Sequence, residues 1–159
     1  MATGEKDPLK MMLTGNYAAA YGAKLARAEA IPVYPITPQT TVMEKVIELI
    51  KTGELEAEYI PLESEHSVMA AAIAAEATGV RVFTASSSQG IAYMHENLFV
   101  ASGLRLPIVM ALANRCLSPP ISIYPDHSDS LAQRDTGWIQ YYVENAQEIV
   151  LKNSCVLLH

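Results

Sequence analysis

The sequence predicts an α/β protein in which a mostly parallel sheet carries helices on both faces. Short apolar segments typical of strands alternate along the chain with longer segments of helical periodicity. The helical segments have 13 to 15 residues, a length that connects parallel strands in β-α-β units. The strand segments 80–85 and 106–113 are almost wholly apolar, as expected of strands that are covered on both faces.

Four strands and four helices follow from these patterns. The strand segments are "IPVY" (31–34), "EYIPL" (58–62), "VRVFTA" (80–85) and "LPIVMALA" (106–113), with weaker candidates at "WIQYYV" (138–143) and "VLL" (156–158). The helix segments are 16–30, 40–52, 64–78 and 88–102. The second helix has a start signal at Thr37–Pro38 and a stop signal at Gly53, and the third ends at Gly79.

The composition indicates one ordinary domain with a substantial core. Half of the 159 residues are hydrophobic and 18% are charged, which is typical of a globular protein. The net charge of −6 argues against nucleic acid as a partner, and no apolar run is long enough to cross a membrane. Cys116 and Cys155 have no metal-ligand spacing, so we expect two reduced thiols in a cytoplasmic protein. Residues 1–14 are interpreted as a polar leader.

Polar groups follow each of the four stronger strands. The junctions are "YPITPQT" (34–40), "LESEHS" (62–67), "TASSSQG" (84–90) and "ANRCLS" (113–118). In parallel sheets, ligands bind at the carboxyl ends of the strands. We therefore expect Thr37, Glu63 or Glu65, the segment 86–89, and Arg115 to lie around one site.

Each junction also has a simpler interpretation. Glu63 and Glu65 can complement a helix dipole, or one of them can project into a cleft with apolar neighbours and exchange a proton. Arg115 can form a surface ion pair or bind a carboxylate in bidentate fashion. The serines of "TASSSQG" can bind an anion, but capping of the following helix is the favoured interpretation.

The remaining histidines and acids favour structural roles. "PDHSDS" (125–130) matches no standard metal motif, and turn chemistry explains its acids at least as well as metal binding. His66 and His95 lie on predicted helices, where packing or surface roles are more common than catalysis.

The order of the motifs resembles a known family. "GNYAAAYGAKLA", "VYPITPQT", "ESEHSVMAAAIAAEATGVRVFTASSSQGIAYMHE" and "GLRLPIVMALANR…DHSDSLAQRDTGWIQYYVENAQE" resemble the α subunit of pyruvate:ferredoxin oxidoreductases, from about Gly15 to Glu148. These are thiamine-diphosphate-dependent enzymes that oxidatively decarboxylate pyruvate to acetyl-CoA and pass electrons to ferredoxin. The resemblance implies a pyrimidine-binding module.

The resemblance also implies roles for four residues. Glu65 matches the glutamate that hydrogen-bonds N1′ of the cofactor's aminopyrimidine, and it is the expected catalytic residue. Pro35 matches a backbone position beside that ring. Thr37 and Arg115 match the residues that hold the carboxylate and keto oxygens of the 2-oxoacid.

Features of the family that this sequence lacks define its expected partners. The family binds the diphosphate through Mg²⁺ at a G-D-G…N motif, and this sequence contains none. Two cysteines cannot ligate a cluster that needs four. We therefore expect a β-type subunit that carries the diphosphate and Mg²⁺ site, an iron–sulfur subunit, ferredoxin and coenzyme A as partners. Because many thiamine-diphosphate sites lie between two modules, homo-oligomer formation stays open.

The family's α subunit is more than twice as long as this chain. Residues 15–159 are therefore expected to form a pyrimidine-binding domain that is truncated at its C-terminal end. Two alternatives stay open. The chain can be a non-catalytic assembly module, or the same enzyme can act on 2-oxoisovalerate or 2-oxoglutarate.

Overall fold

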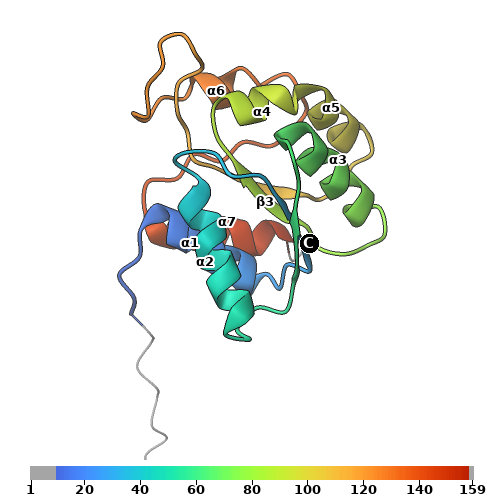
Figure 1. The fold of residues 1–159 in the computed structure, drawn as a ribbon, viewed down its shortest axis with the longest axis vertical. Coiled ribbons are helices and arrows are strands. Elements are labelled where there is room, and N and C mark those ends of the chain that lie inside the picture. Colours follow the sequence, from blue (N-terminus) through green and yellow to red (C-terminus); the bar gives the residue numbers. More distant parts are fainter. Residues whose placement is uncertain (1–9, 158–159) are drawn as a thin grey trace, which may run out of the picture.

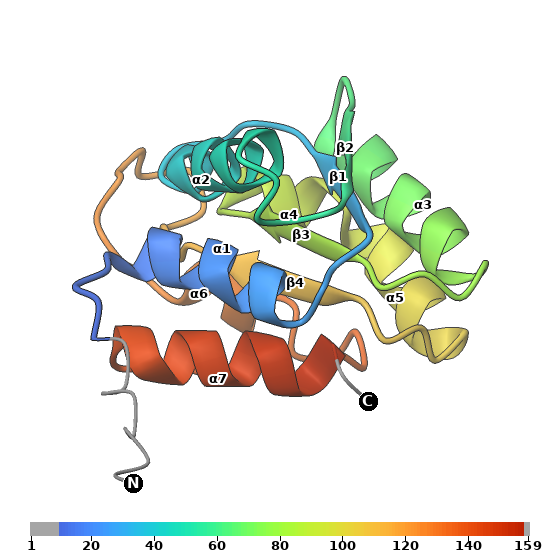
Figure 2. The same cartoon turned by 90° about the horizontal axis from the view of Figure 1, so that it is seen from below.

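Four short parallel strands form the centre of the fold in the computed structural model, which describes residues 10–157 (Figures 1 and 2). Strand β1 (Ala30–Val33) pairs with β2 (Glu58–Pro61), and β3 (Phe83–Ser86) pairs with β4 (Val109–Leu112). A parallel bridge between Ala30 and Val82 joins the pairs, giving the order β2-β1-β3-β4. Pro32 has no N–H to continue the ladder towards β3, and its carbonyl instead accepts the Thr84 hydroxyl at 2.8 Å.

Helices cover both faces of these strands, as the sequence predicts. One face carries α1 (Gly15–Leu25), α2 (Thr40–Lys51) and α7 (Ala146–Leu157), and the other carries α3 (Glu65–Glu76), α4 (Gln89–Tyr93) and α5 (His95–Gly103). Side chains alternate between the two cores: Ile31 and Phe83 are buried in the first, and Ala30 and Val82 in the second. The short helix α6 (Ser128–Leu131) contacts α4.

Helices α1 and α7 lie side by side, with α7 beneath α1 in Figure 2. A stretch of small residues on α1 allows this close approach, since Ala18, Ala19, Gly22 and Ala23 are all buried. At Gly22 a β-carbon would lie only 2.6 Å from the Asn153 Cβ. A larger residue there would force the two helices apart.

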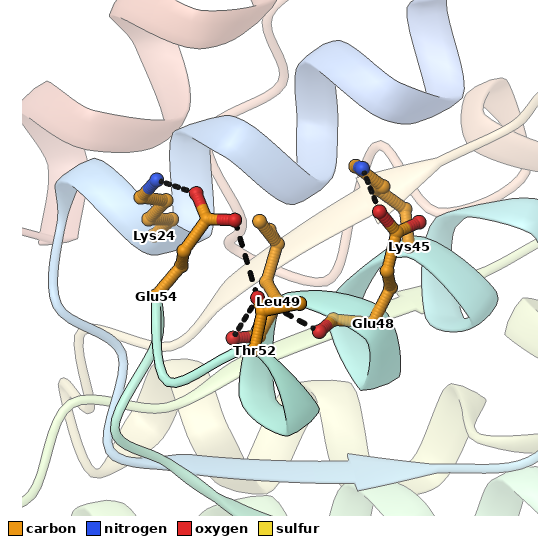
Figure 3. Close-up of polar contacts among 6 residues, drawn as sticks. All are labelled: Lys24, Lys45, Glu48, Leu49, Thr52 and Glu54. Carbon is orange, nitrogen blue, oxygen red and sulfur yellow. Dashed lines mark hydrogen bonds and ion pairs between the residues drawn. The ribbon is translucent and has the colours of Figure 1, made fainter.

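Polar contacts tie the end of α2 to α1, as Figure 3 shows. The Lys24 ammonium lies 2.5 Å from the Glu54 carboxylate, and the Thr52 hydroxyl lies 3.1 Å from the Glu48 carbonyl and from Glu54 Oε1. Lys45 donates to the Glu48 carboxylate at 2.7 Å. These contacts are exposed, so we assign them a role in orienting the turn rather than a large share of the stability.

Four segment predictions are wrong or incomplete. The helix predicted at 16–30 ends at Leu25, and Ala30 already belongs to β1. The single helix predicted at 88–102 is two helices, α4 and α5, separated by a turn at Met94. The strand predicted at 138–143 is irregular, because its side chains bind other elements: the Trp138 indole donates to the Leu98 carbonyl at 2.9 Å, and the Gln140 amide donates to the Ser130 carbonyl at 2.8 Å. Residues 156 and 157 belong to α7 and not to a strand, and residue 158 lies outside the described residues.

The predicted leader (1–14) falls mostly outside the described residues, and its last residue, Thr14, caps α1 by accepting the Tyr17 N–H at 3.3 Å. Between residues 10 and 157, no helix is both long enough and apolar enough to cross a membrane.

Candidate functional site

A buried glutamine anchors the loop between β1 and α2 to the neighbouring strand β3. Gln39 is fully buried, and its side-chain amide donates to the Ala85 carbonyl of β3 at 2.9 Å. Thr37 is held on the exposed side of this loop, and Pro35 lies exposed two residues earlier. The loop therefore holds Thr37 exposed at the carboxyl end of β1.

Arg115, which follows β4, reaches across to that loop. Its guanidinium donates to the Thr37 carbonyl at 2.8 Å and to Gln89 Oε1 at 2.9 Å. Within residues 10–157 the side chain forms no ion pair, so the interpretation of Arg115 as a surface ion pair is not supported. Both acceptors are neutral, and the guanidinium therefore keeps its charge and several N–H donors for an anion.

The two acids of "LESEHS" lie in different environments. Glu63 is exposed and accepts the Ser67 hydroxyl, which lowers the pKa of the Glu63 carboxyl. Glu65 is the first residue of α3, which Ser64 caps by accepting the Ser67 N–H at 3.2 Å. Glu65 is half-buried, and its carboxylate has no hydrogen-bond partner in the described part of the chain. Of the two acids, Glu65 is thus the one available to bind another group.

A glycine allows the Glu65 carboxylate to lie against α4. A β-carbon on Gly90 would lie 2.9 Å from Glu65 Oε1 and closer still to Ser86 Oγ. Ser86 is fully buried, and its hydroxyl has no partner among the described residues. Because Gln89 holds Arg115 and Gly90 adjoins Glu65, the start of α4 joins the two groups of candidate residues.

The favoured interpretation of the serines as helix caps is wrong. Ser88 is the cap residue of α4, but its side chain makes no capping bond, because its backbone has φ +45° and ψ −122° rather than the extended conformation of a capping serine. Its hydroxyl lies 2.5 Å from Gln89 Oε1 and 2.6 Å from the Cys116 carbonyl. The hydroxyls of Ser86 and Ser87 are buried and unpartnered in the described structure.

"PDHSDS" combines a local turn with a long-range contact. Asp126 Oδ1 accepts the Ser128 N–H at 2.6 Å, which is the expected turn chemistry. Asp129 is fully buried and accepts hydrogen bonds from Ser88 and Arg115, a role that local spacing could not reveal. No group of three or more potential metal ligands occurs within residues 10–157.

The two helical histidines make aromatic contacts that fit the predicted packing role. His66 lies 5.8 Å from Tyr93 between ring centroids, and His95 meets Phe99 edge-on at 5.2 Å. Neither belongs to the group around Arg115 and Glu65.

A hollow of about 300 Å³ opens beside the Arg115 guanidinium. It is lined by Gln89, Arg115, Cys116, Ser118, Ile121 and Ser122. Arg115 is the one charged residue in this lining, and Ile121 adds an exposed apolar surface. The arrangement suits a small organic anion with an apolar group.

Comparisons with known proteins agree with this description. Residues 21–153 match the family model described as pyruvate flavodoxin/ferredoxin oxidoreductase, thiamine diphosphate-binding. The chain is 63% identical over 137 residues to pyruvate synthase subunit PorA of Methanocaldococcus jannaschii, covering 86% of this chain and 35% of that one. It is 58% identical over 145 residues to ketoisovalerate oxidoreductase subunit VorA of Pyrococcus horikoshii, covering 91% and 37%. The chain therefore spans about a third of the length of these curated relatives.

A solved structure shares the fold. It is a 2-oxoglutarate:ferredoxin oxidoreductase from Magnetococcus marinus, which matches with a TM-score of 0.81 over 92% of this chain and 26% of that one. At 22% sequence identity, this likeness supports the predicted α/β fold and carries no statement about the substrate.

Proposed function

This chain belongs to the thiamine-diphosphate-binding family of pyruvate flavodoxin/ferredoxin oxidoreductases, and on that basis we propose that it is a working part of a 2-oxoacid:ferredoxin oxidoreductase. In this role it supplies the aminopyrimidine half of the cofactor site together with the clamp for the substrate. The complete enzyme converts pyruvate and coenzyme A to acetyl-CoA and carbon dioxide, and it passes the electrons to ferredoxin.

The single observation that supports this proposal most directly is the environment of the Glu65 carboxylate. Its carboxylate is half-buried, lies against Gly90 beside the buried, unpartnered hydroxyl of Ser86, and accepts no hydrogen bond within residues 10–157. An aminopyrimidine presents a ring nitrogen that a carboxyl group can hydrogen-bond, so this donor set fits thiamine diphosphate. When bound, the cofactor supplies the electron sink for loss of carbon dioxide from a 2-oxoacid. Glu65 holds or releases a proton at the ring nitrogen, and Pro35 offers backbone beside the ring.

Arg115 and Thr37 form the substrate clamp in this proposal. The guanidinium is already oriented by two neutral acceptors, the Thr37 carbonyl and Gln89 Oε1. Its remaining N–H groups bind the carboxylate of the 2-oxoacid, and the Thr37 hydroxyl donates to an oxygen of the same substrate.

We assign the other functions of the enzyme to protein outside this sequence. A β-type subunit binds the diphosphate and Mg²⁺, an iron–sulfur subunit carries the clusters, and ferredoxin accepts the electrons. The relatives are named as subunits, which supports an assembly of several chains. The cytoplasmic location and the domain at 15–159 stay predictions.

Pyruvate is the substrate we propose first, because a pyruvate synthase subunit is among the relatives with the highest identity. Ketoisovalerate oxidoreductase subunits are nearly as similar, so 2-oxoisovalerate is the second candidate. Arg115 and Thr37 contact only groups that all 2-oxoacids share, and the choice between substrates depends on the apolar part of the site.

The experiment is an anaerobic purification of the assembly through a tag on this chain, expressed in its native cells. The eluate is assayed for reduction of a viologen dye with coenzyme A and each of pyruvate, 2-oxoisovalerate and 2-oxoglutarate. We expect turnover that requires both the 2-oxoacid and coenzyme A, fastest with pyruvate. A folded chain that brings down no partner and shows no turnover would overturn the proposal in favour of a non-catalytic assembly module.

A further inference from the structure

Asp129 is a buried carboxylate that the proposed chemistry does not use. It lies in α6 and is fully buried. Burial of a carboxylate is costly unless the charge is paired or fully hydrogen-bonded. Within residues 10–157 no lysine, arginine or histidine forms an ion pair with it, so hydrogen bonds alone stabilise the charge.

Four N–H groups donate to this one carboxylate. Oδ2 accepts the backbone N–H of Ser88 at 2.9 Å and that of Arg115 at 3.0 Å. Oδ1 accepts the Asn114 side-chain amide at 2.7 Å and the backbone N–H of Ser130 at 2.7 Å. The carboxylate thereby ties together α6 and the two loops that follow β3 and β4.

These loops carry both the Arg115 guanidinium and one of its acceptors. Arg115 is bound to Asp129 through its own backbone, and Gln89, which accepts from the guanidinium, directly follows Ser88. Ser88 adopts a positive φ of 45°, a conformation that non-glycine residues rarely keep unless the surroundings enforce it. The charge-assisted hydrogen bond that the Ser88 N–H donates to the Asp129 carboxylate is such an enforcing contact.

We propose that Asp129 is a positioning residue that places the Arg115 guanidinium between Thr37 and Gln89, and that it thereby sets the affinity for the substrate's carboxylate. Asp129 acts through backbone N–H groups and does not touch the substrate. The statement about affinity rests on the proposed function, whereas the placement of Arg115 can be tested without it.

The test compares Asp129→Asn with the matched control Asp126→Asn in the anaerobically purified assembly. The amide keeps the shape of the carboxylate but has one acceptor oxygen, so it cannot serve all four donors. Asp126 lies three residues earlier, and its carboxylate accepts the Ser128 N–H of the local turn at 2.6 Å. We expect Asp129→Asn to raise the KM for the 2-oxoacid about 10- to 100-fold with kcat changed less than about threefold, and Asp126→Asn to leave KM within about twofold. If Asp129→Asn instead unfolded part of the protein, fewer molecules would be active, so kcat would fall while the KM stayed constant.

A second readout follows Arg115 itself. Phenylglyoxal modifies accessible guanidinium groups, and peptide mass spectrometry gives the rate at Arg115. We expect this rate to rise severalfold in Asp129→Asn and to stay unchanged in Asp126→Asn. If the wild-type assembly has no 2-oxoacid activity, the proposed function fails, while the labelling still decides whether Asp129 places Arg115.

Asn114→Ala is the second variant in case Asp129→Asn does not fold. It removes one donor to Asp129 Oδ1, and we expect a smaller change of the same kind in the KM and in the labelling rate. Unchanged KM and unchanged Arg115 labelling in whichever of the two variants folds would overturn the inference.

Discussion

Gly90→Ala provides a sensitive test of the geometry around Glu65. A methyl group at this position would lie 2.9 Å from Glu65 Oε1 and 3.0 Å from Glu65 Cγ, and it would overlap Ser86 Oγ. These distances are shorter than normal contacts of a β-carbon. The Glu65 carboxylate must therefore move away from α4, and the Ser86 hydroxyl must rotate.

The expected effects on stability and on activity differ in size. Overpacking costs about 1–3 kcal/mol, and the higher helix propensity of alanine returns about 1 kcal/mol, so the free energy of unfolding should fall by at most about 2 kcal/mol. The Glu65 carboxylate ends a flexible side chain and can yield, whereas Ser86 Oγ is buried, so the cost stays within this range. A displacement of a catalytic group by about 1 Å can cost about 100-fold in rate. We therefore expect kcat/KM to fall about 100-fold in an enzyme that is still folded.

The assay is 2-oxoacid-dependent dye reduction by the purified assembly, together with its thermal unfolding. Gly103→Ala is the matched control, because Gly103 is the last residue of α5 and a β-carbon there meets nothing within 4 Å. It should keep full activity. Wild-type activity in Gly90→Ala would refute the placement of Glu65 against Gly90.

Three further predictions concern other parts of the fold and site. Gly22→Ala should lower the free energy of unfolding by about 1–3 kcal/mol, because the new methyl group would lie 2.6 Å from the Asn153 Cβ, which is anchored to the backbone. Denaturant titration measures this change, and unchanged stability would contradict the packing of α1 against α7. Burial raises the pKa of Glu76 above its ordinary 4.5, although Glu76 also accepts the Val82 N–H at 2.9 Å. The stabilisation that comes from this raised pKa is thus complete below pH 4.5 and is lost as the pH rises through the pKa of Glu76 in the folded protein. Glu76→Gln should abolish this part of the pH dependence of the unfolding temperature. Arg115→Lys should raise the KM for the 2-oxoacid about 10- to 100-fold, since an ammonium cannot reproduce the planar fork, and an unchanged KM would argue against a bidentate clamp.

The elements with strong periodicity were predictable from the sequence. The segments of β1 to β4, of α2 and of α3 are predicted because apolar spacing and glycine stops act locally. The end of α1 at Leu25 is not, because no glycine marks it. The helix at 88–102 is predicted as one element, because no proline interrupts the segment and the turn at Met94, which separates α4 from α5, has no local signal. Segment 138–143 has the composition of a strand, but Trp138 and Gln140 bind other elements instead.

The part of the site that depends only on the parallel arrangement of the strands was predictable from the sequence. Parallel strands bring their carboxyl ends to one edge, which was enough to expect Thr37 and Arg115 close together, and the structure places the guanidinium on the Thr37 carbonyl. The roles of Gln39, Gly90 and Asp129 depend on partners 46, 25 and 41 residues away, namely Ala85, Glu65 and Ser88. No spacing rule covers such distances, so these residues emerge only from the fold.

The measurement that tests the central claim most directly compares Glu65→Gln with Glu63→Gln in the purified assembly. Both changes replace a carboxylate by an amide two residues apart, and only Glu65 has a carboxylate free to bind the cofactor's ring nitrogen. We expect Glu65→Gln to reduce turnover by at least about 100-fold and to weaken thiamine diphosphate binding, with its unfolding temperature unchanged. Glu63→Gln should behave like the wild type. Full turnover and cofactor affinity in Glu65→Gln would contradict the assignment of this chain as the aminopyrimidine half of the site.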